Sequence, residues 1–305
     1  MASSSPLLVC VVGPTAIGKT SLAISIAKAF QTEIISADSR QFFKEMSIGT
    51  AVPSPAELRE VPHHFIQNKS IFESYSVGDF EKEAMALLET LFDKHSVVVL
   101  VGGSGLYVNA VVQGLDNFPD VAPGVRNALN EQWEVHGIES LREELQKADP
   151  DYYEKVDIHN PHRLIRALEV FRSTGRPFSS YLEGKSSIRG FRTLFVGLTA
   201  ERELVYDRIN KRVDLMMEAG LLDEVRSLHP HKKLNALQTV GYRELFEHLD
   251  GERKLTESVE EIKKNTRRFA KRQGTWFRKR QDIYWFDYSL PHTEIINFIK
   301  KKNTL

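Results

Sequence analysis

The sequence has a single cysteine, Cys10, and no long hydrophobic run. One cysteine cannot form an internal disulfide, and it argues against a cysteine-based zinc finger. No apolar run approaches the roughly 18 residues that cross a membrane. The residues before the first apolar run also lack the basic segment and cleavage site of a signal peptide. We therefore expect a cytoplasmic protein with no membrane segment and with Cys10 buried in a strand.

Low-complexity tracts, Gly/Ser linkers and internal repeats are also missing from the 305 residues. With 41% hydrophobic residues, the chain can bury one large core, or a core and a smaller domain. Neither sign of charge is in excess, because 41 basic residues balance 41 acidic ones.

The charge is nevertheless unevenly spread. Between Glu261 and Gln281, nine Lys and Arg residues accompany one acidic residue. A concentrated basic segment in a neutral protein favours one polyanionic partner, although a solvated helix face is the simpler interpretation. The helical spacing of Phe269, Gln273 and Trp276 predicts that the aromatic side chains of this segment pack in the core rather than stack on bases.

A phosphate-binding loop is present at residues 13–20, "GPTAIGKT", directly after the apolar run "LLVCVV". The glycines of such a loop let backbone N–H groups surround phosphate oxygens at a helix N-terminus. Lys19 adds a cation, and the Thr20 hydroxyl is placed to hold Mg²⁺. The motif predicts a diphosphate or triphosphate site, of the kind found in nucleotide-binding and ATP-binding proteins, without identifying the ligand.

Strand-like and helix-like segments alternate around this loop, which predicts an α/β fold with a P-loop NTPase-like parallel sheet flanked by helices. "TEIIS" and "SVVVLV" are further strands, and a helix capped by Ser76 is expected between them. Polar, helix-like sequence without strand signals then predicts a helical insert. The expected organisation is a first core part at 1–118, the insert at 119–187 and a second core part at 188–305. This last part opens with a strand at "FRTLFVGLTA", continues as a long helical stretch over 201–228 and stays mostly helical through the basic region.

Asp38 follows the second strand and lies beside the phosphate loop in the predicted sheet. It is either a general base or a turn residue that caps Ser39–Gln41. The third strand ends in "GGSG", without the aspartate that holds Mg²⁺ in many P-loop ATPases, and this argues against a motor or switch. Gly102 and Gly103, with Ser104, suit either close approach of a ligand or a simple turn.

Arg208 and Arg212 are four residues apart and share one face of a predicted helix. They could neutralise a leaving or transferred group, or form surface salt bridges with Glu201 and Glu203. Three classes stay open on these grounds: an enzyme acting on RNA, a small-molecule kinase and an RNA-binding regulator. The basic segment and the insert favour a substrate as large as RNA.

Six segments in order resemble the tRNA isopentenyltransferase family, whose bacterial members are tRNA dimethylallyltransferases: "GPTAIGKT", "IISADSRQ", "VGGSGLYV", "NPHRLIRALEV", "LQTVGYRE" and "RFAKRQGTWFR". The resemblance extends from about Leu7 to Trp285. Adenylate isopentenyltransferases are similar in the core but characteristically lack the tRNA-binding segments.

The resemblance implies transfer of a dimethylallyl group from dimethylallyl pyrophosphate to N6 of adenosine 37 in the tRNA anticodon stem-loop, with pyrophosphate released. The base would be flipped out of its stack, and Asp38 would take the amine proton. The implied catalytic residues are Asp38, Lys19, Thr20 and Arg212, with Mg²⁺ on Thr20 and a monomeric enzyme.

Two sets of binding residues follow from the same resemblance. The implied pyrophosphate-binding residues are Gly13, Pro14, Thr15, Ala16, Ile17, Gly18, Lys19, Thr20 and Arg208. The implied tRNA-binding residues are Asp38, Ser39, Arg40, Gln41, Ser104, Arg126, His162, Arg163, Arg166, Gln238, Gly241, Tyr242, Arg243, Lys271, Arg272, Gln273, Trp276 and Arg278.

Overall fold

The computed structural model describes residues 5–182 and 188–303 and divides the chain into two compact units. The second unit is Gly114–Ser187, and the first unit contains the chain on both sides of it. The sequence placed the insert at 119–187. The last residues of that range, 183–187, lie outside the described residues.

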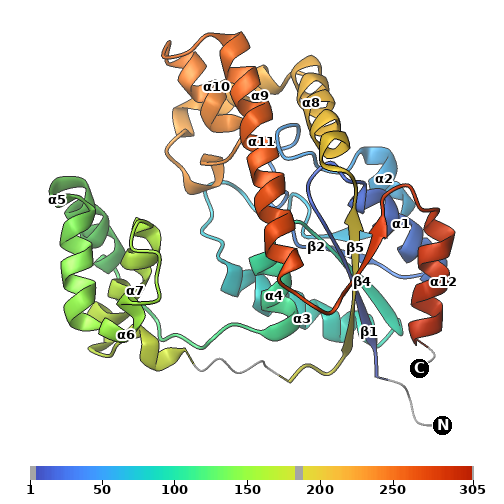
Figure 1. The fold of residues 1–305 in the computed structure, drawn as a ribbon, viewed down its shortest axis with the longest axis horizontal. Coiled ribbons are helices and arrows are strands. Elements are labelled where there is room, and N and C mark those ends of the chain that lie inside the picture. The colour runs from blue at the N-terminus through green and yellow to red at the C-terminus, as the bar shows by residue number, and fades with distance from the viewer. Residues whose placement is uncertain (1–4, 183–187, 304–305) are drawn as a thin grey trace. The chain divides into compact units, whose positions relative to one another are not determined.

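A parallel six-stranded sheet forms the centre of the first unit, in the order β3-β2-β4-β1-β5-β6 (Figure 1). The strands are β1 (Leu7–Val12), β2 (Ile34–Ser36), β3 (His63–His64), β4 (Val97–Val101), β5 (Arg192–Thr199) and β6 (Ile283–Asp287). Every neighbouring pair is parallel, which confirms the predicted fold class. Cys10 is buried in β1, as expected.

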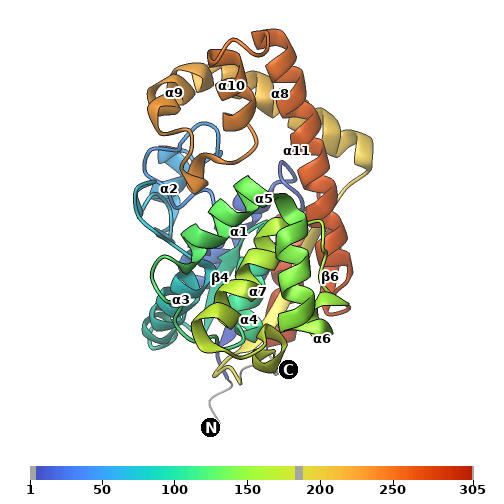
Figure 2. The same ribbon diagram turned by 90° about the vertical axis from the view of Figure 1, so that its left-hand side faces the viewer.

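Helices cover this sheet and extend beyond one end of it (Figures 1 and 2). They are α1 (Lys19–Phe30), α2 (Pro55–Glu60), α3 (Val77–Phe92), α4 (Gly105–Gln113), α8 (Arg202–Glu218), α9 (Leu221–Leu228), α10 (Tyr242–Leu249), α11 (Leu255–Arg278) and α12 (His292–Asn303). Ser76 caps α3 by accepting a hydrogen bond from the Asp79 N–H, which confirms the predicted cap.

The two faces of the sheet pack into separate hydrophobic clusters because alternate side chains of a strand point to opposite sides. In β1, Leu7, Val9 and Val11 join one cluster, and Leu8, Cys10 and Val12 join the other. A third cluster, which includes Leu221, Leu237 and Leu245, holds α9, α10 and α11 together. Because both faces of the sheet are buried, the strands and the loops that follow them are held in defined positions.

Two details of the second core part go beyond the sequence prediction. The helical stretch expected over 201–228 consists of two helices, because Gly220 has a left-handed backbone, with φ of 95°, and ends the first of them. The part expected to be mostly helical also contains β6, an edge strand that pairs only with β5 among the described strands. Its residues, "IYWFD", favour strands, but the segment is only five residues long, and such a short apolar run does not identify a strand by its periodicity.

Among its described residues, 114–182, the second unit contains helices joined by loops and no strand. It contains α5 (Val125–Ala148), α6 (Pro150–Tyr153), α7 (Pro161–Thr174) and a 3₁₀ turn at Phe178–Tyr181. α5 is kinked at Gly137, where the backbone leaves the helical region. The second unit has its own hydrophobic core, which contains Leu129, Leu141 and Leu168.

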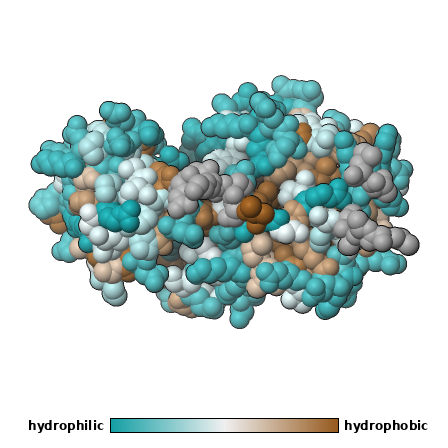
Figure 3. Space-filling model, turned by 90° about the horizontal axis from the view of Figure 1, so that it is seen from below, coloured by the Kyte–Doolittle hydropathy of each residue, from teal (hydrophilic) through white to brown (hydrophobic). Residues whose placement is uncertain are grey.

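Hydrophilic side chains predominate on the face drawn in Figure 3, with hydrophobic ones exposed in small groups between them. Among the described residues, no helix combines the length and the apolar character that a membrane crossing needs.

Candidate active site

Three strands bring the predicted chemistry to one edge of the sheet, because parallel strands end on the same side. β1 leads into the phosphate loop, β2 into Asp38, and β4 into Gly102 and Gly103. Backbone hydrogen bonds join the ends: the Ala37 N–H donates to Val101 O at 2.7 Å, and the Gly102 N–H donates to Val11 O at 3.2 Å.

The phosphate loop turns sharply at two glycines with positive φ, 143° at Gly13 and 111° at Gly18. A Cβ at Gly13 would lie 2.8 Å from the Leu198 carbonyl oxygen, so the loop passes too close to β5 for a side chain. α1 begins at Lys19, whose Nζ donates to the Pro14 carbonyl at 2.7 Å. Burial lowers the pKa of Lys19 to about 8, although Asp38 opposes this.

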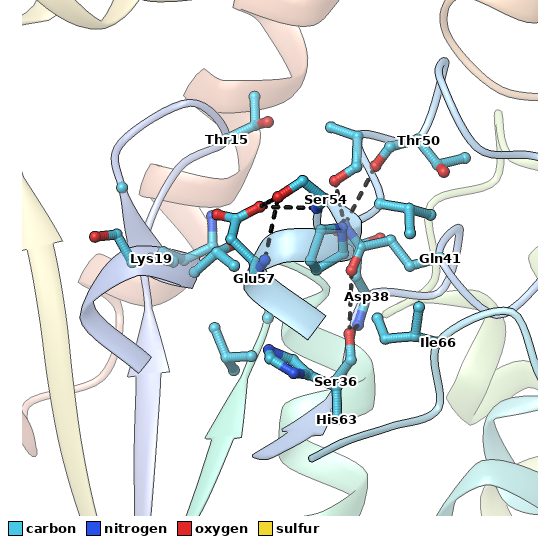
Figure 4. A pocket seen from close by; sticks show the side chains of 18 of the residues that line it. Thr15, Lys19, Ser36, Asp38, Gln41, Thr50, Ser54, Glu57, His63 and Ile66 are labelled. Carbon is cyan, nitrogen blue, oxygen red and sulfur yellow. Dashed lines mark hydrogen bonds between the residues drawn. The ribbon is translucent and has the colours of Figure 1, made fainter. Parts of the chain in front are cut away.

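A cavity of about 360 Å³ lies against this loop (Figure 4). Its lining includes Thr15 to Thr20 of the loop, the loop Thr50–Ser54, and Asp38 and Arg212. This first pocket therefore gathers most of the predicted pyrophosphate residues, while Gly13, Pro14 and Arg208 are not part of its lining. Thr50, Glu57 and His63 also line it, and no motif in the sequence pointed to them.

Asp38 meets both interpretations that the sequence left open. Its Oδ1 accepts a hydrogen bond from the Arg40 N–H at 3.1 Å, so it caps the following turn. It also lines the first pocket. Burial raises the pKa of Asp38, although Lys19, Arg40 and Arg212 act in the opposite direction. A carboxylate with a raised pKa is a better proton acceptor than a solvated one.

The arginine pair lies against the phosphate loop. Arg208 Nε donates to the Ala16 carbonyl at 2.7 Å, and Arg212 Nη1 donates to Thr15 Oγ1 at 3.5 Å. Burial and the neighbouring Arg208 lower the pKa of Arg212. Within the described residues, neither arginine forms an ion pair with Glu201 or Glu203. Two cations thus face a loop suited to an anion.

A second pocket, of about 560 Å³, shares Thr15, Asp38 and Arg212 with the first. Many of the predicted tRNA residues line it: Ser39, Arg40, Ser104, Gln238, Gly241, Arg243, Arg272, Gln273 and Trp276. Leu106, Tyr107, Met216 and Phe269 add an apolar wall that the sequence did not identify as part of a site. Asp38 is therefore accessible from both pockets.

Other predicted tRNA residues lie elsewhere. Arg126, His162, Arg163 and Arg166 belong to the second unit, where Glu169 pairs with both Arg126 and Arg166. Lys271 and Arg278 are exposed on α11. Gln41 lines the first pocket, and its Nε2 donates to the Ala51 carbonyl at 2.9 Å.

Tyr242 has an internal role. Its side chain is completely buried, and its hydroxyl donates to Glu224 at 2.6 Å. The same carboxylate accepts from the N–H groups of Ser47, Ile48 and Gly49 at 3.0, 2.8 and 3.0 Å. Glu224 and Tyr242 therefore hold the loop that carries Thr50 and Ala51 into both pockets. The expectation that Tyr242 touches tRNA does not fit its burial.

Helix α11 and the end of β2 pack closely against the glycines after β4. A Cβ at Gly103 would lie 2.2 Å from Gln273 Nε2, and one at Gly105 would lie 2.2 Å from the Trp276 ring. A Cβ at Gly102 would meet the Ala37 carbonyl oxygen at 2.6 Å. The sequence suggested a ligand surface or a turn, and these glycines do line the pockets: Gly102 the first, and Gly103 and Gly105 the second.

The expected core packing of the α11 aromatics is wrong for two of them. Phe269 and Trp276 are 39% and 42% exposed and line the second pocket. Ala270, Gln273 and Phe277 face the core instead. Of the three residues expected on the buried face, only Gln273 is buried. The other buried positions are Ala270 and Phe277, each one residue after the expected aromatic, and helical spacing alone does not distinguish such neighbouring faces.

The basic segment divides into paired and unpaired charges. Lys263 pairs with Asp214 and Glu260, Lys264 with Glu261, and Arg280 with Asp282. The other six, Arg267, Arg268, Lys271, Arg272, Arg278 and Lys279, form no ion pair in the part of the chain that the structure describes, although Arg267 donates to Asn210 Oδ1. The free positive charge is therefore concentrated in the C-terminal half of α11.

Comparisons with known proteins agree with this site. Residues 41–280 match the family model described as IPP transferase. The chain is 57% identical, over 98% of its length and 99% of the relative, to the tRNA dimethylallyltransferase of Christiangramia forsetii. It is 46% identical to tRNA dimethylallyltransferase 1 of Bacteroides thetaiotaomicron, over 98% of the chain and 96% of the relative.

Two solved structures resemble the fold. The tRNA isopentenylpyrophosphate transferase of Bacillus halodurans matches with a TM-score of 0.73 and 38% identity, over 97% of this chain and 96% of that one. A eukaryotic dimethylallyltransferase acting on tRNA matches with a TM-score of 0.83 and 26% identity, over 97% and 80%. Taken with the family model, which matches most of the chain, these relatives show that the protein belongs to the IPP transferase family.

Proposed function

We propose that this protein is a tRNA dimethylallyltransferase, which moves the dimethylallyl group of dimethylallyl pyrophosphate to N6 of adenosine 37 in tRNA. The observation that carries the proposal is the position of Asp38, which lines both the phosphate-loop pocket and the adjoining pocket. A donor in the first pocket and an adenine in the second would meet at this carboxylate. The names of the relatives support the same reaction.

The chemistry of the acceptor gives Asp38 its role. The N6 amine of adenine is a poor nucleophile because its lone pair is delocalised into the ring. As N6 attacks the allylic carbon, the N–C bond forms, the C–O bond to pyrophosphate breaks, and the amine proton passes to Asp38. The raised pKa of this buried carboxyl suits it to accept the proton.

The reaction also requires that the leaving pyrophosphate be stabilised. The allylic C–O bond can ionise early because the cation is delocalised, so stabilising the leaving anion lowers the barrier. Lys19, Arg212 and the residues of the loop line the first pocket, so they would stabilise that charge on a pyrophosphate bound there. Arg208 holds the loop through Ala16 and adds positive charge behind it.

The residues of the first pocket fit a magnesium ion. Thr20 supplies a hydroxyl oxygen, which is the kind of donor that Mg²⁺ prefers. The described residues contain no group of three or more His, Cys, Asp or Glu that could hold a metal by themselves. Few protein ligands are usual for Mg²⁺, which keeps waters and binds substrate phosphates. When bound, Mg²⁺ would neutralise charge on the leaving pyrophosphate.

Unpaired cations support tRNA binding. Lys271, Arg272, Arg278 and Lys279 carry charge that no acidic side chain among the described residues neutralises. In the second unit, Glu169 is shared by Arg126 and Arg166, which leaves one net positive charge in the group. Lys and Arg at such positions gain affinity for RNA by releasing counterions. We further propose that the protein is a monomer, because one chain supplies both pockets. We also propose that it is cytoplasmic, because its proposed substrate is tRNA.

The test offers each donor with each acceptor. Dimethylallyl pyrophosphate or ATP is combined with unmodified tRNA or AMP, and the products are identified by mass after nucleoside digestion. We expect N6-dimethylallyladenosine only from tRNA with dimethylallyl pyrophosphate. A modified AMP would instead indicate an adenylate isopentenyltransferase, and a phosphorylated product would indicate a kinase.

A further inference from the structure

Gln273 is a polar side chain of α11 that is 93% removed from solvent, with a relative exposure of 7%. Both ends of its amide have partners within the protein. Its Oε1 accepts a hydrogen bond from the Thr15 N–H at 2.9 Å, and its Nε2 donates to the Gly103 carbonyl at 3.0 Å. The amide keeps one N–H and one carbonyl lone pair for further hydrogen bonds, but the two observed bonds fix it to the protein itself.

These two bonds join three separate pieces of the site. Thr15 lies in the phosphate loop, Gly103 follows β4, and Gln273 belongs to the basic helix. The approach is close, because a Cβ at Gly103 would lie 2.2 Å from Gln273 Nε2. Gly103 therefore has to be a glycine for the glutamine to reach the loop.

The hydrogen bond at Thr15 matters for the donor. Thr15 lines both pockets, and its hydroxyl accepts a hydrogen bond from Arg212. Gln273 thus fixes the backbone of the same residue that Arg212 contacts through its side chain. The neighbouring turn of α11 carries Lys271 and Arg272, which have no acidic partner among the described residues.

We propose that Gln273 is a positioning residue that fastens the phosphate loop at Thr15 to α11, so that the tRNA-binding helix and the pyrophosphate site hold one geometry. The identities of donor and acceptor rest on the proposed function. The positioning itself rests on the two hydrogen bonds and the burial of the amide.

The first test removes the amide while keeping the shape. Gln273→Met is compared with Gln281→Met, the same substitution at an exposed position beyond α11. Binding of inorganic pyrophosphate with Mg²⁺ is measured by calorimetry, and tRNA binding is measured separately. We expect pyrophosphate affinity to fall roughly three- to tenfold in Gln273→Met, as loss of neutral hydrogen bonds predicts, with tRNA affinity within twofold of wild type.

The second test uses a carboxyl group that can imitate the amide only when protonated. In Gln273→Glu, the protonated acid can accept from the Thr15 N–H and donate to the Gly103 carbonyl, whereas the ionised form places a negative oxygen against that carbonyl. Titratable or charged groups that line the same pocket are Asp38, Arg40, Tyr107, Arg212, Arg243 and Arg272. Transfer activity is divided by that of wild type at each pH, which corrects for the titration that these groups have in wild type.

We expect the relative activity of Gln273→Glu to be highest at low pH and to fall as pH rises, with Gln273→Met low and flat. A ratio for Gln273→Glu that does not change with pH would overturn the proposal, as would equal pyrophosphate binding by wild type and Gln273→Met. These outcomes leave the proposed function intact. That function fails separately if wild type forms no prenylated tRNA.

Discussion

Asp38 combines the two roles that the sequence left as alternatives, a turn-capping residue and a candidate general base. Its Oδ1 caps the turn after β2, and its carboxylate faces both pockets. The hydrogen bond to the turn holds the side chain in place, while burial raises its pKa. A residue that is both fixed and basic is well suited to take a proton from a weakly nucleophilic amine.

Asp38→Asn keeps the shape and removes the proton acceptor. We expect turnover to fall by roughly 10²–10⁴-fold, the usual contribution of a general base, with pyrophosphate and tRNA affinities little changed. Single-turnover kinetics and calorimetry measure the two effects. Asp93→Asn, at the exposed end of α3, is the control and should match wild type. Full turnover by Asp38→Asn would rule out the proton-transfer role.

Lys19 predicts an upper pH limit for donor binding. Its pKa is lowered to about 8, so the ammonium that holds pyrophosphate is present below that pH and lost above it. Asp38 acts in the opposite sense, since it must lose its proton before it can accept one. We therefore expect a bell-shaped pH profile of kcat/KM for the donor, with the alkaline limb near pH 8.

Lys19→Arg should remove that alkaline limb, because a guanidinium stays charged over the whole range. The control is Lys28→Arg on the same helix, where the lysine pairs with Glu60 away from the phosphate loop. An alkaline limb that persists unchanged in Lys19→Arg would assign it to another group.

At the scale of elements, the sequence predicted most accurately what strong local patterns determine. The phosphate loop, Asp38 after β2 and the Ser76 cap all follow from short motifs with fixed geometry. The short edge strand β6 and the break at Gly220 carried weaker signals. Contacts between distant segments had no local signal at all, as with Glu224 on the loop after Met46 and Gln273 on the phosphate loop.

The Glu224 contact gives a prediction about the pocket wall. Glu224→Ala leaves the N–H groups of Ser47, Ile48 and Gly49 and the Tyr242 hydroxyl without their acceptor. We expect the free energy of unfolding to fall by about 3 kcal/mol and the donor KM to rise, because this loop lines both pockets. Urea unfolding and kinetics measure both. Glu218→Ala, exposed at the end of α8, is the control, and equal stability of the two variants would contradict the role.

Helix α11 gives a prediction about tRNA. Replacing Lys271 and Arg272 together with glutamine should weaken tRNA binding and reduce the slope of log affinity against log salt by up to about two. Lys263 and Lys264, replaced in the same way, form the matched control, because both already pair with acidic side chains. If the control pair changes the slope as much as the test pair, the paired and unpaired halves of the helix do not differ as the structure indicates.

At the scale of the whole molecule, the chain has no net charge, but its positive charges are concentrated in separate places. Buried cations gather at the phosphate loop, and unpaired ones gather on the C-terminal half of α11. The second unit adds an arginine pair around one glutamate. A phosphate loop of this type often serves phosphoryl transfer, and many such proteins hold Mg²⁺ with an aspartate at the end of the third strand. Here glycines follow β4, and the carboxylate near the loop is Asp38, which also lines the second pocket. The arrangement suits carbon transfer with pyrophosphate as the leaving group.

The most direct measurement of that claim is the stoichiometry of one turnover. Wild-type protein is mixed with unmodified tRNA, dimethylallyl pyrophosphate, Mg²⁺ and ATP, and pyrophosphate, N6-dimethylallyladenosine and remaining ATP are quantified together. We predict one pyrophosphate for each modified adenosine, none without tRNA, and ATP unchanged. Consumption of ATP in step with product, or a phosphate group on the acceptor, would contradict the account.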